Sequence, residues 1–174
     1  MPLTLDERLQ YDRLIAEAVR RSTSRFSTFF ADSGPLARTG YLKHLDFFAA
    51  GKKFKERLFM AANRVGKSEA GAYELTCHLT GLYPDWWEGR RFETPVECWA
   101  VGTNSQTTRD IVQAKLLGSV QMPGTGMVPG HLIVSTISSR GLPGALEGAV
   151  IRHASGGTSL LGLKTYEQGR PRAS

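Results

Sequence analysis

Residues 61–68 read A-A-N-R-V-G-K-S, and this stretch decides which fold the sequence predicts. A Walker A phosphate loop has the pattern G-x-x-x-x-G-K-[ST] between a strand and a helix. Gly66, Lys67 and Ser68 match the last three fixed positions, and Ala61 stands at the position of the first glycine. Alanine is compatible with that position as long as its backbone keeps a negative φ. The stretch therefore predicts a loop that binds nucleotide phosphates.

Each polar group of this loop has an expected role. Backbone N–H groups around Gly66 would approach phosphate oxygens, which the dipole of the following helix also attracts. Lys67 would neutralise charge on the β- and γ-phosphates of ATP, and the Ser68 hydroxyl would ligate Mg²⁺. Arg64 is either a solvent-facing cation or an arginine supplied in cis to the charge that develops on the γ-phosphate. The predicted catalytic residues are Arg64 and Lys67, and the predicted nucleotide-binding residues are Ala61, Ala62, Asn63, Arg64, Val65, Gly66, Lys67 and Ser68.

The segments on either side of the loop predict an α/β fold. The apolar run 57–62 is typical of a buried strand, which we expect at the centre of a sheet, and 69–80 predicts a helix that ends at Gly81. A second apolar strand is expected over 96–101, followed by a helix over about 105–117. The order strand, loop, helix, strand, helix indicates a parallel sheet of the P-loop NTPase (ASCE) type.

The N-terminal part of the chain, 1–50, is predicted to be helical. Thr4 and Glu7 form the T-x-x-E pattern of a capping box, and apolar residues at helical spacing follow it. These signals predict a helix over 5–22 and a shorter one near 39–50. The Trp86-Trp87 pair is expected to pack beneath a Pro-Asp turn, and the alternative is contact with DNA or a partner.

Glycine and proline become frequent after Leu117. Between them, 131–137 is predicted to be a strand, and 150–153 and 160–164 are predicted to form a β-hairpin. Gly- and Pro-rich residues 118–130 are expected to be mobile and to cover little of the core.

Composition excludes several classes of protein. The chain has 174 residues, 41% of them hydrophobic and 22% charged, which is typical of one soluble domain. Its apolar runs are far shorter than the ~20 residues of a membrane-spanning helix, and its charged start is no secretory signal. Cys77 and Cys98 form no C-x-x-C pair, so a disulfide scaffold or cysteine zinc site is not expected. Four histidines lack metal-ligand spacing and are expected to be solvated or in the core: His44, His78, His131 and His153.

The net charge of +6 is concentrated in the two flanks of the chain. Residues 1–60 carry eleven basic and seven acidic residues, whereas 61–139 carry six and seven. The densest basic cluster is Lys52, Lys53, Lys55 and Arg57. It is either a solvated face or a surface for nucleic-acid phosphates. No base-reading motif accompanies it, so sequence-specific recognition is not expected.

The sequence resembles the large terminase subunit of tailed bacteriophages and prophages, the ATP-driven motor of viral DNA packaging. The resemblance rests on A-A-N-R-V-G-K-S-E-A-G-A-Y-E at 61–74, G-L-Y-P-D-W-W-E-G-R-R-F at 81–92, W-A-V-G at 99–102 and T-Y-E-Q-G-R at 165–170. It implies ATP and Mg²⁺ as cofactors and double-stranded viral DNA as a partner. For the full-length protein it also implies portal protein and small terminase subunit as partners, in the bacterial cytoplasm and away from membranes. In the family a region before the first strand helps to hold adenine, here near 45–57.

The sequence also departs from this family. ATP hydrolysis in this class needs a Walker B strand that ends in Asp-Glu, which holds Mg²⁺ and activates water. The apolar runs 96–101 and 132–137 end without such a pair, and no nuclease domain is found. We therefore expect 51–174 to be a partial ATPase domain, truncated before Walker B and inactive alone. The alternative is a non-catalytic nucleotide- or DNA-binding prophage remnant. A small P-loop kinase is disfavoured, because Arg90-Arg91 is its sole support.

Overall fold

The structure, a computed structural model, describes residues 4–23 and 25–166. Helices dominate the first half: α1 (Leu5–Thr23), α2 (Arg25–Thr28), the short 3-10 helix η1 (Arg38–Gly40), α3 (Leu42–Ala50) and α4 (Lys67–Thr80). Strand β1 (Glu97–Gly102) then leads into a continuous helical run of α5 (Ser105–Thr107), η2 (Thr108–Gln113) and α6 (Ala114–Leu117). The last part is mostly strands: β2 (Gly118–Ser119), β3 (Met122–Pro123), the 3-10 helix η3 (Gly130–Leu132), β4 (Ile133–Ser138), β5 (Leu146–Arg152) and β6 (Thr158–Thr165).

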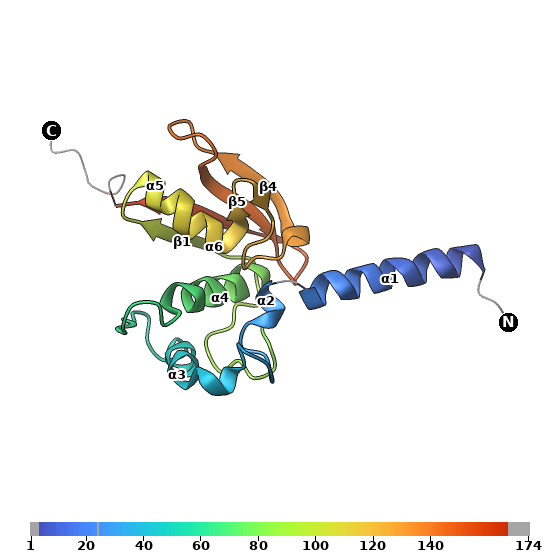
Figure 1. Cartoon of the computed structure of the whole chain (residues 1–174), viewed down its shortest axis with the longest axis horizontal. Coiled ribbons are helices and arrows are strands. Elements are labelled where there is room, and N and C mark those ends of the chain that lie inside the picture. Colours follow the sequence, from blue (N-terminus) through green and yellow to red (C-terminus); the bar gives the residue numbers. More distant parts are fainter. Residues whose placement is uncertain (1–3, 24, 167–174) are drawn as a thin grey trace.

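The elements form one body from which a single helix projects. Figure 1 shows α1 extending away from the rest, the sheet together with α5 and α6 on one side of α4, and α3 on its other side. Leu5, Leu9 and Leu14 of α1 are correspondingly exposed. No helix among the described residues combines the length and the apolar character that crossing a bilayer requires.

The main sheet is mixed, with strand order β1-β6-β5-β4. Strands β1 and β6 are parallel, with Glu97 opposite Leu160 and Gly102 opposite Thr165. Strand β5 is antiparallel to both β4 and β6. Short connections between consecutive strands permit antiparallel pairing, whereas parallel pairing needs a long crossover. The α/β class is confirmed, but the expectation of an all-parallel sheet is wrong.

The apolar segment 57–62 is not the central strand that the sequence predicted. It lies outside every helix and strand of the structure, and the side chains of Leu58 and Met60 are 80% and 81% exposed. A buried strand needs a neighbour on each edge. Among the described residues, β1 pairs with β6 on one edge and with no strand on the other. The prediction of a buried central strand over 57–62 is therefore wrong, because no described strand pairs with this segment.

The helix predictions are confirmed with small changes at the ends. The capping box at the start of α1 is formed, since the Thr4 backbone N–H donates to Glu7 Oε2 at 2.8 Å. Helix α4 begins two residues earlier than expected and ends at Gly81, whose φ of 70° is the left-handed conformation that glycine favours. The helical run 105–117 and the predicted hairpin are present, with longer strands in the hairpin.

Aromatic side chains form the core beneath α3 and α4. Phe48 of α3 stacks on Trp87 with ring centroids 4.9 Å apart, and Tyr73 of α4 lies edge-on to Phe30 at 4.9 Å. Trp87 is buried, and its indole N–H donates to the Arg90 carbonyl at 3.0 Å. Such ring pairs stabilise a core beyond the area they bury. Trp87, the second residue of the Trp pair, therefore packs in the core, as expected.

Residues 118–130 contribute to the core, contrary to expectation. Met127 and Val128 are fully buried, and their backbone N–H groups donate to the carbonyls of Lys115 and Leu116 at 2.7 and 2.9 Å. Gly126 lies directly against the backbone of Leu116, where a larger residue would not fit. The glycines of this segment thus permit close backbone packing.

Candidate nucleotide-phosphate site

The predicted phosphate loop leads directly into α4. Residues 61–66 lie outside any helix or strand, and α4 begins at Lys67 with Gly66 as its N-cap. Gly66 has φ 86° and ψ 14°, a conformation that favours glycine. The first N–H groups of a helix have no carbonyl partner within it, and their partial positive charge attracts anions. The loop thus ends where the first N–H groups of α4 begin, as in phosphate-binding loops, but the strand expected before it is absent from the described structure.

Lys67 is folded back over the loop. Its ammonium group donates to the carbonyl oxygens of Ala61 and Ala62, each at 2.6 Å. These two hydrogen bonds hold the positively charged ammonium across the loop, beside the N-terminus of α4. Ala61 and Lys67, the first and seventh residues of the motif, therefore lie in contact.

The remaining loop side chains face solvent. Asn63, Arg64, Val65 and Ser68 are all exposed. Arg64 has φ 63°, which is uncommon for a residue other than glycine and is found where a loop is tightly constrained. The exposed guanidinium and hydroxyl groups are free to meet a ligand at the mouth of the loop.

His44 of α3 forms a hydrogen bond to the backbone of the loop. Its Nε2 lies 3.0 Å from the Val65 carbonyl, which can only accept, so Nε2 carries the proton. Nδ1 of the same ring is buried and has no partner within the described part of the chain. A Cβ added to Gly66 would stand 3.4 Å from Nε2. His44 is thus a core histidine, as expected, and it also contacts the candidate loop, which the sequence did not indicate.

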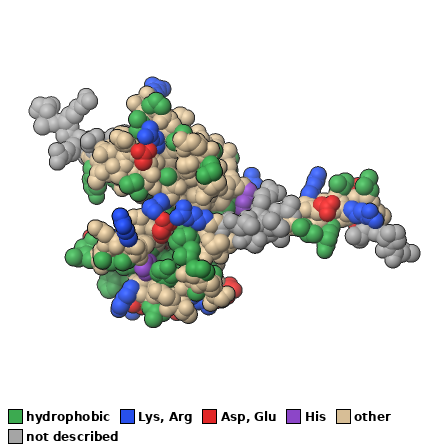
Figure 2. Space-filling model, viewed as in Figure 1, with side chains coloured by type: hydrophobic (Ala, Val, Ile, Leu, Met, Phe, Trp, Pro, Cys, Tyr) green, Lys and Arg blue, Asp and Glu red, His purple; other side chains and the backbone are tan. Residues whose placement is uncertain are grey.

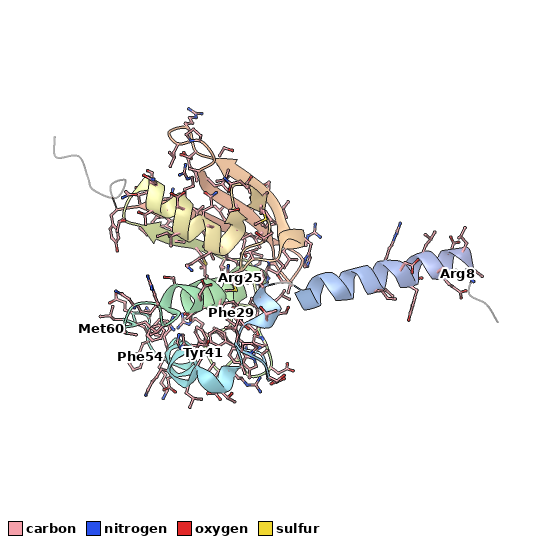
Figure 3. All side chains as sticks on the ribbon, in the orientation of Figure 1. Arg8, Arg25, Phe29, Tyr41, Phe54 and Met60 are labelled. Atoms are coloured by element: carbon pink, nitrogen blue, oxygen red, sulfur yellow. The ribbon has the colours of Figure 1, made fainter. Side chains whose placement is uncertain are left out.

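A cavity of about 440 Å³ opens beside the loop. Arg64, Val65 and Gly66 form one wall, and Phe29 and Tyr41 contribute aromatic surface to another. Figure 3 shows Phe29 beside Arg25 near α2, and Tyr41 near α3. Sequence reasoning missed these aromatic residues. The signal was present in the Phe cluster at 26–30, but nothing in the sequence indicated that it lies near the loop.

A second cavity of about 410 Å³ lies on the other side of the first turns of α4. Ser68 borders it, together with Arg57, Ala100 of β1 and Lys115 of α6. It adjoins the edge of β1 that pairs with no described strand. Ser68, the last residue of the phosphate loop, therefore borders this second cavity.

Elsewhere in the described structure, the two cysteines are not activated, and the potential metal ligands do not cluster. Burial raises the pKa of Cys77 well above its usual range, and burial followed by the charge of Glu97 raises the pKa of Cys98 to about 11. Both thiols are therefore protonated near neutral pH and poorly nucleophilic. Within residues 4–23 and 25–166, no three histidine, cysteine or acidic residues come together in a group that could hold a metal ion.

Comparisons with known proteins agree with the motifs. Residues 58–169 match the family described as terminase large subunit, T4likevirus-type, N-terminal. The terminase large subunit of Salmonella phage P22 is 36% identical over an alignment of 152 residues, and the match covers 76% of this chain and 30% of that relative. The chain thus spans about a third of the length of the curated relative it matches. No solved structure matches the chain significantly. Because the family match covers more than half of the chain, the chain belongs to the terminase large-subunit family, in its N-terminal region.

Proposed function

We propose that this chain binds ATP with Mg²⁺ at the phosphate loop 61–68, as the nucleotide-binding part of a P-loop motor that packages viral DNA. The observation that carries the proposal is the left-handed Gly66 at the N-terminus of α4, with the Lys67 ammonium held across the loop. Membership of the terminase family supports the link to packaging. Calorimetric titration with MgATP tests the proposal: saturable binding supports it, and no binding at millimolar nucleotide contradicts it.

Lys67 is the main countercharge for the nucleotide. In the empty loop its ammonium donates to two carbonyls, and a bound phosphate would replace them with anionic oxygens. An anionic oxygen attracts the ammonium more strongly than a neutral carbonyl does, because two opposite charges then interact directly. The backbone N–H groups that begin α4 would donate to the same phosphates. Arg64, exposed beside them, is the candidate arginine that would reach the γ-phosphate.

The donor set fits a magnesium ion held mainly by its substrate. Mg²⁺ commonly takes one or two protein oxygens and completes its shell with phosphates and water. Ser68 offers an exposed hydroxyl next to Lys67. When bound, the ion would neutralise phosphate charge and fix the orientation of the phosphates.

The cavity beside the loop is the place for the nucleobase. It begins at Arg64, Val65 and Gly66, so a base within it would remain connected to phosphates on the loop. Phe29 and Tyr41 offer aromatic surface against which a base can pack. Phe29 and Tyr41 come earlier in the sequence than residues 45–57, the region in which the family resemblance placed adenine contacts.

We predict that the chain alone does not turn over ATP at a detectable rate. Strands β1, β4, β5 and β6 end at Gly102, Ser138, Arg152 and Thr165, so no described strand presents the Asp-Glu pair that would activate water. A phosphate-release assay, with and without DNA, measures this. Steady-state release that disappears in K67A would contradict the prediction.

DNA is the proposed partner, bound without sequence preference. The structure removes Arg57 from the basic surface, because its guanidinium donates to the Phe47 carbonyl and to Glu74. Lys52, Lys53 and Lys55 remain exposed. In full-length relatives the resemblance adds portal protein and small terminase subunit as proposed partners, at the procapsid in the host cytoplasm.

We predict weak duplex DNA binding that falls about 40-fold for a fourfold rise in salt, since three lysine–phosphate contacts would release three counterions. Fluorescence anisotropy with random and phage-derived duplexes measures the salt dependence. The triple variant K52A/K53A/K55A should lose most of the salt dependence, and R64A serves as a control elsewhere on the surface. Salt-insensitive binding, or strong preference for one duplex, would contradict this mode of contact.

A further inference from the structure

Glu69 joins three segments that are distant in the sequence. It is the third residue of α4 and follows Ser68 directly. Its Oε2 accepts from Arg25 Nη2 of α2 at 3.0 Å, and its Oε1 accepts from the Lys115 ammonium of α6. The side chain of Glu69 is only 18% exposed, so water screens these ion pairs less than it screens pairs on the open surface. One carboxylate thus ties the start of α4 to a helix on each side of it.

The carboxylate lies between the two cavities that border the phosphate loop. Glu69 itself lines the cavity proposed for the base, while Lys115 and Ser68 line the second cavity. Arg25 also lies 5.5 Å from the ring of Phe29, which lines the first cavity. Figure 2 shows basic side chains beside an acidic one where the part that carries the sheet meets the part that carries α3. A substitution of Glu69 would therefore alter the lining of both cavities that border the loop.

The charge balance of this cluster suits a neighbouring phosphate. A lone carboxylate in the first turn of α4 would interact favourably with the helix dipole but would repel an anion bound at the loop. Arg25 and Lys115 together outweigh the single negative charge of Glu69. The cluster as a whole is therefore positive, and the carboxylate can anchor the helix without opposing the nucleotide.

We propose that Glu69 is a positioning residue of the phosphate site, an inference that rests on the proposed binding of ATP. By holding the first turn of α4 between Arg25 and Lys115, it keeps the N–H groups that follow Gly66, and the Ser68 hydroxyl, in place for phosphate and Mg²⁺. Sites of this kind lose affinity when the groups that support them are loosened, even though these groups do not touch the ligand.

The test is titration of wild type, E69A, E69Q, K115M and K67A with MgATP and with magnesium tripolyphosphate, well below the melting temperature of each variant. E69A should weaken binding of both ligands about tenfold, as is typical of coupled neighbouring sites. E69Q, which keeps the shape and one hydrogen bond, should fall between E69A and wild type. The double variant E69A/K115M should bind no more weakly than E69A, because both changes break the same ion pair. D110N is the matched control, since Asp110 pairs with Arg109 outside this cluster.

The outcomes separate this inference from the proposed function. If wild type binds tripolyphosphate and K67A does not, but E69A binds as wild type does, the role of Glu69 is overturned while the phosphate site stands. If D110N weakens binding as much as E69A, the effect is general and the role of Glu69 is again overturned. If wild type binds neither ligand, both the inference and the ATP site are overturned. A loss confined to E69A, E69Q and K115M supports the positioning role.

Discussion

Replacing Lys67 with alanine is expected to weaken MgATP binding about 100-fold or more, which would place it beyond detection if wild-type binding is weak. The ammonium is the charge held across the loop, through its contacts with the Ala61 and Ala62 carbonyls. Without it, the phosphates would face the helix N-terminus with most of their charge uncompensated. Isothermal titration of wild type and K67A under the same conditions measures the difference.

The matched control for this change is K43A. Lys43 is also a helical lysine, and its side chain is 88% exposed and pairs only loosely with Asp46, at 3.6 Å. K43A should bind MgATP as wild type does, and both variants should keep the wild-type circular dichroism. Equal affinity in K67A and wild type would show that nucleotide, if it binds, binds somewhere other than the loop.

Glu74→Ala is expected to be the most destabilising of the polar substitutions, at about 3 kcal/mol of unfolding free energy. Glu74 Oε1 accepts from Arg57 Nη2 at 2.9 Å, and their side chains are 10% and 20% exposed. Arg57 also donates to the Phe47 carbonyl at 2.7 Å and lies 4.5 Å from the Phe47 ring. Removing the carboxylate would leave a largely buried guanidinium without its charge partner. Urea denaturation followed by tryptophan fluorescence measures the change.

An exposed ion pair provides the comparison. D46A removes the partner of Lys43, where both side chains are mostly exposed, and should cost no more than about 1 kcal/mol. The double variant R57M/E74L, which removes both charges and retains apolar volume, should recover much of the stability lost in E74A. If E74A is as stable as D46A, the Arg57–Glu74 pair does not stabilise the fold.

The sequence predicted helices better than strands, for a physical reason. Helix signals are local: the Thr4–Glu7 capping box and the left-handed Gly81 mark ends that the structure reproduces. The strand predicted over 57–62 failed because an apolar run indicates burial only when a partner is present, and partners are not local. Strand β5 extends back to Leu146, where Glu147 and Gly148 weakened the strand pattern. Gly148 lies against the Leu161 carbonyl of the neighbouring strand, a packing requirement that the pattern alone does not reveal.

The candidate site likewise has one part that the sequence indicated and one part that it did not. The position of the loop before α4 was predictable from the spacing of Gly66, Lys67 and Ser68, whereas its binding of phosphate stays a prediction. The surroundings of the loop were not predictable. His44 meets Val65 across 21 positions of sequence, and Arg25 meets Glu69 across 44. Only the packing of α2 and α3 against α4 brings such residues together, and it is this packing that encloses a cavity beside the loop.

Two-dimensional ¹H–¹⁵N NMR of the uniformly labelled chain, titrated with MgATP, tests the central claim most directly. If the phosphates bind at residues 61–68, the largest and saturable shifts should fall on the backbone N–H groups from Arg64 to Ala70, with smaller shifts around Tyr41 and His44. The same titration of K67A should leave these resonances in place. Saturable shifts confined to other parts of the chain, or no shifts at millimolar MgATP from a folded protein, would contradict the account.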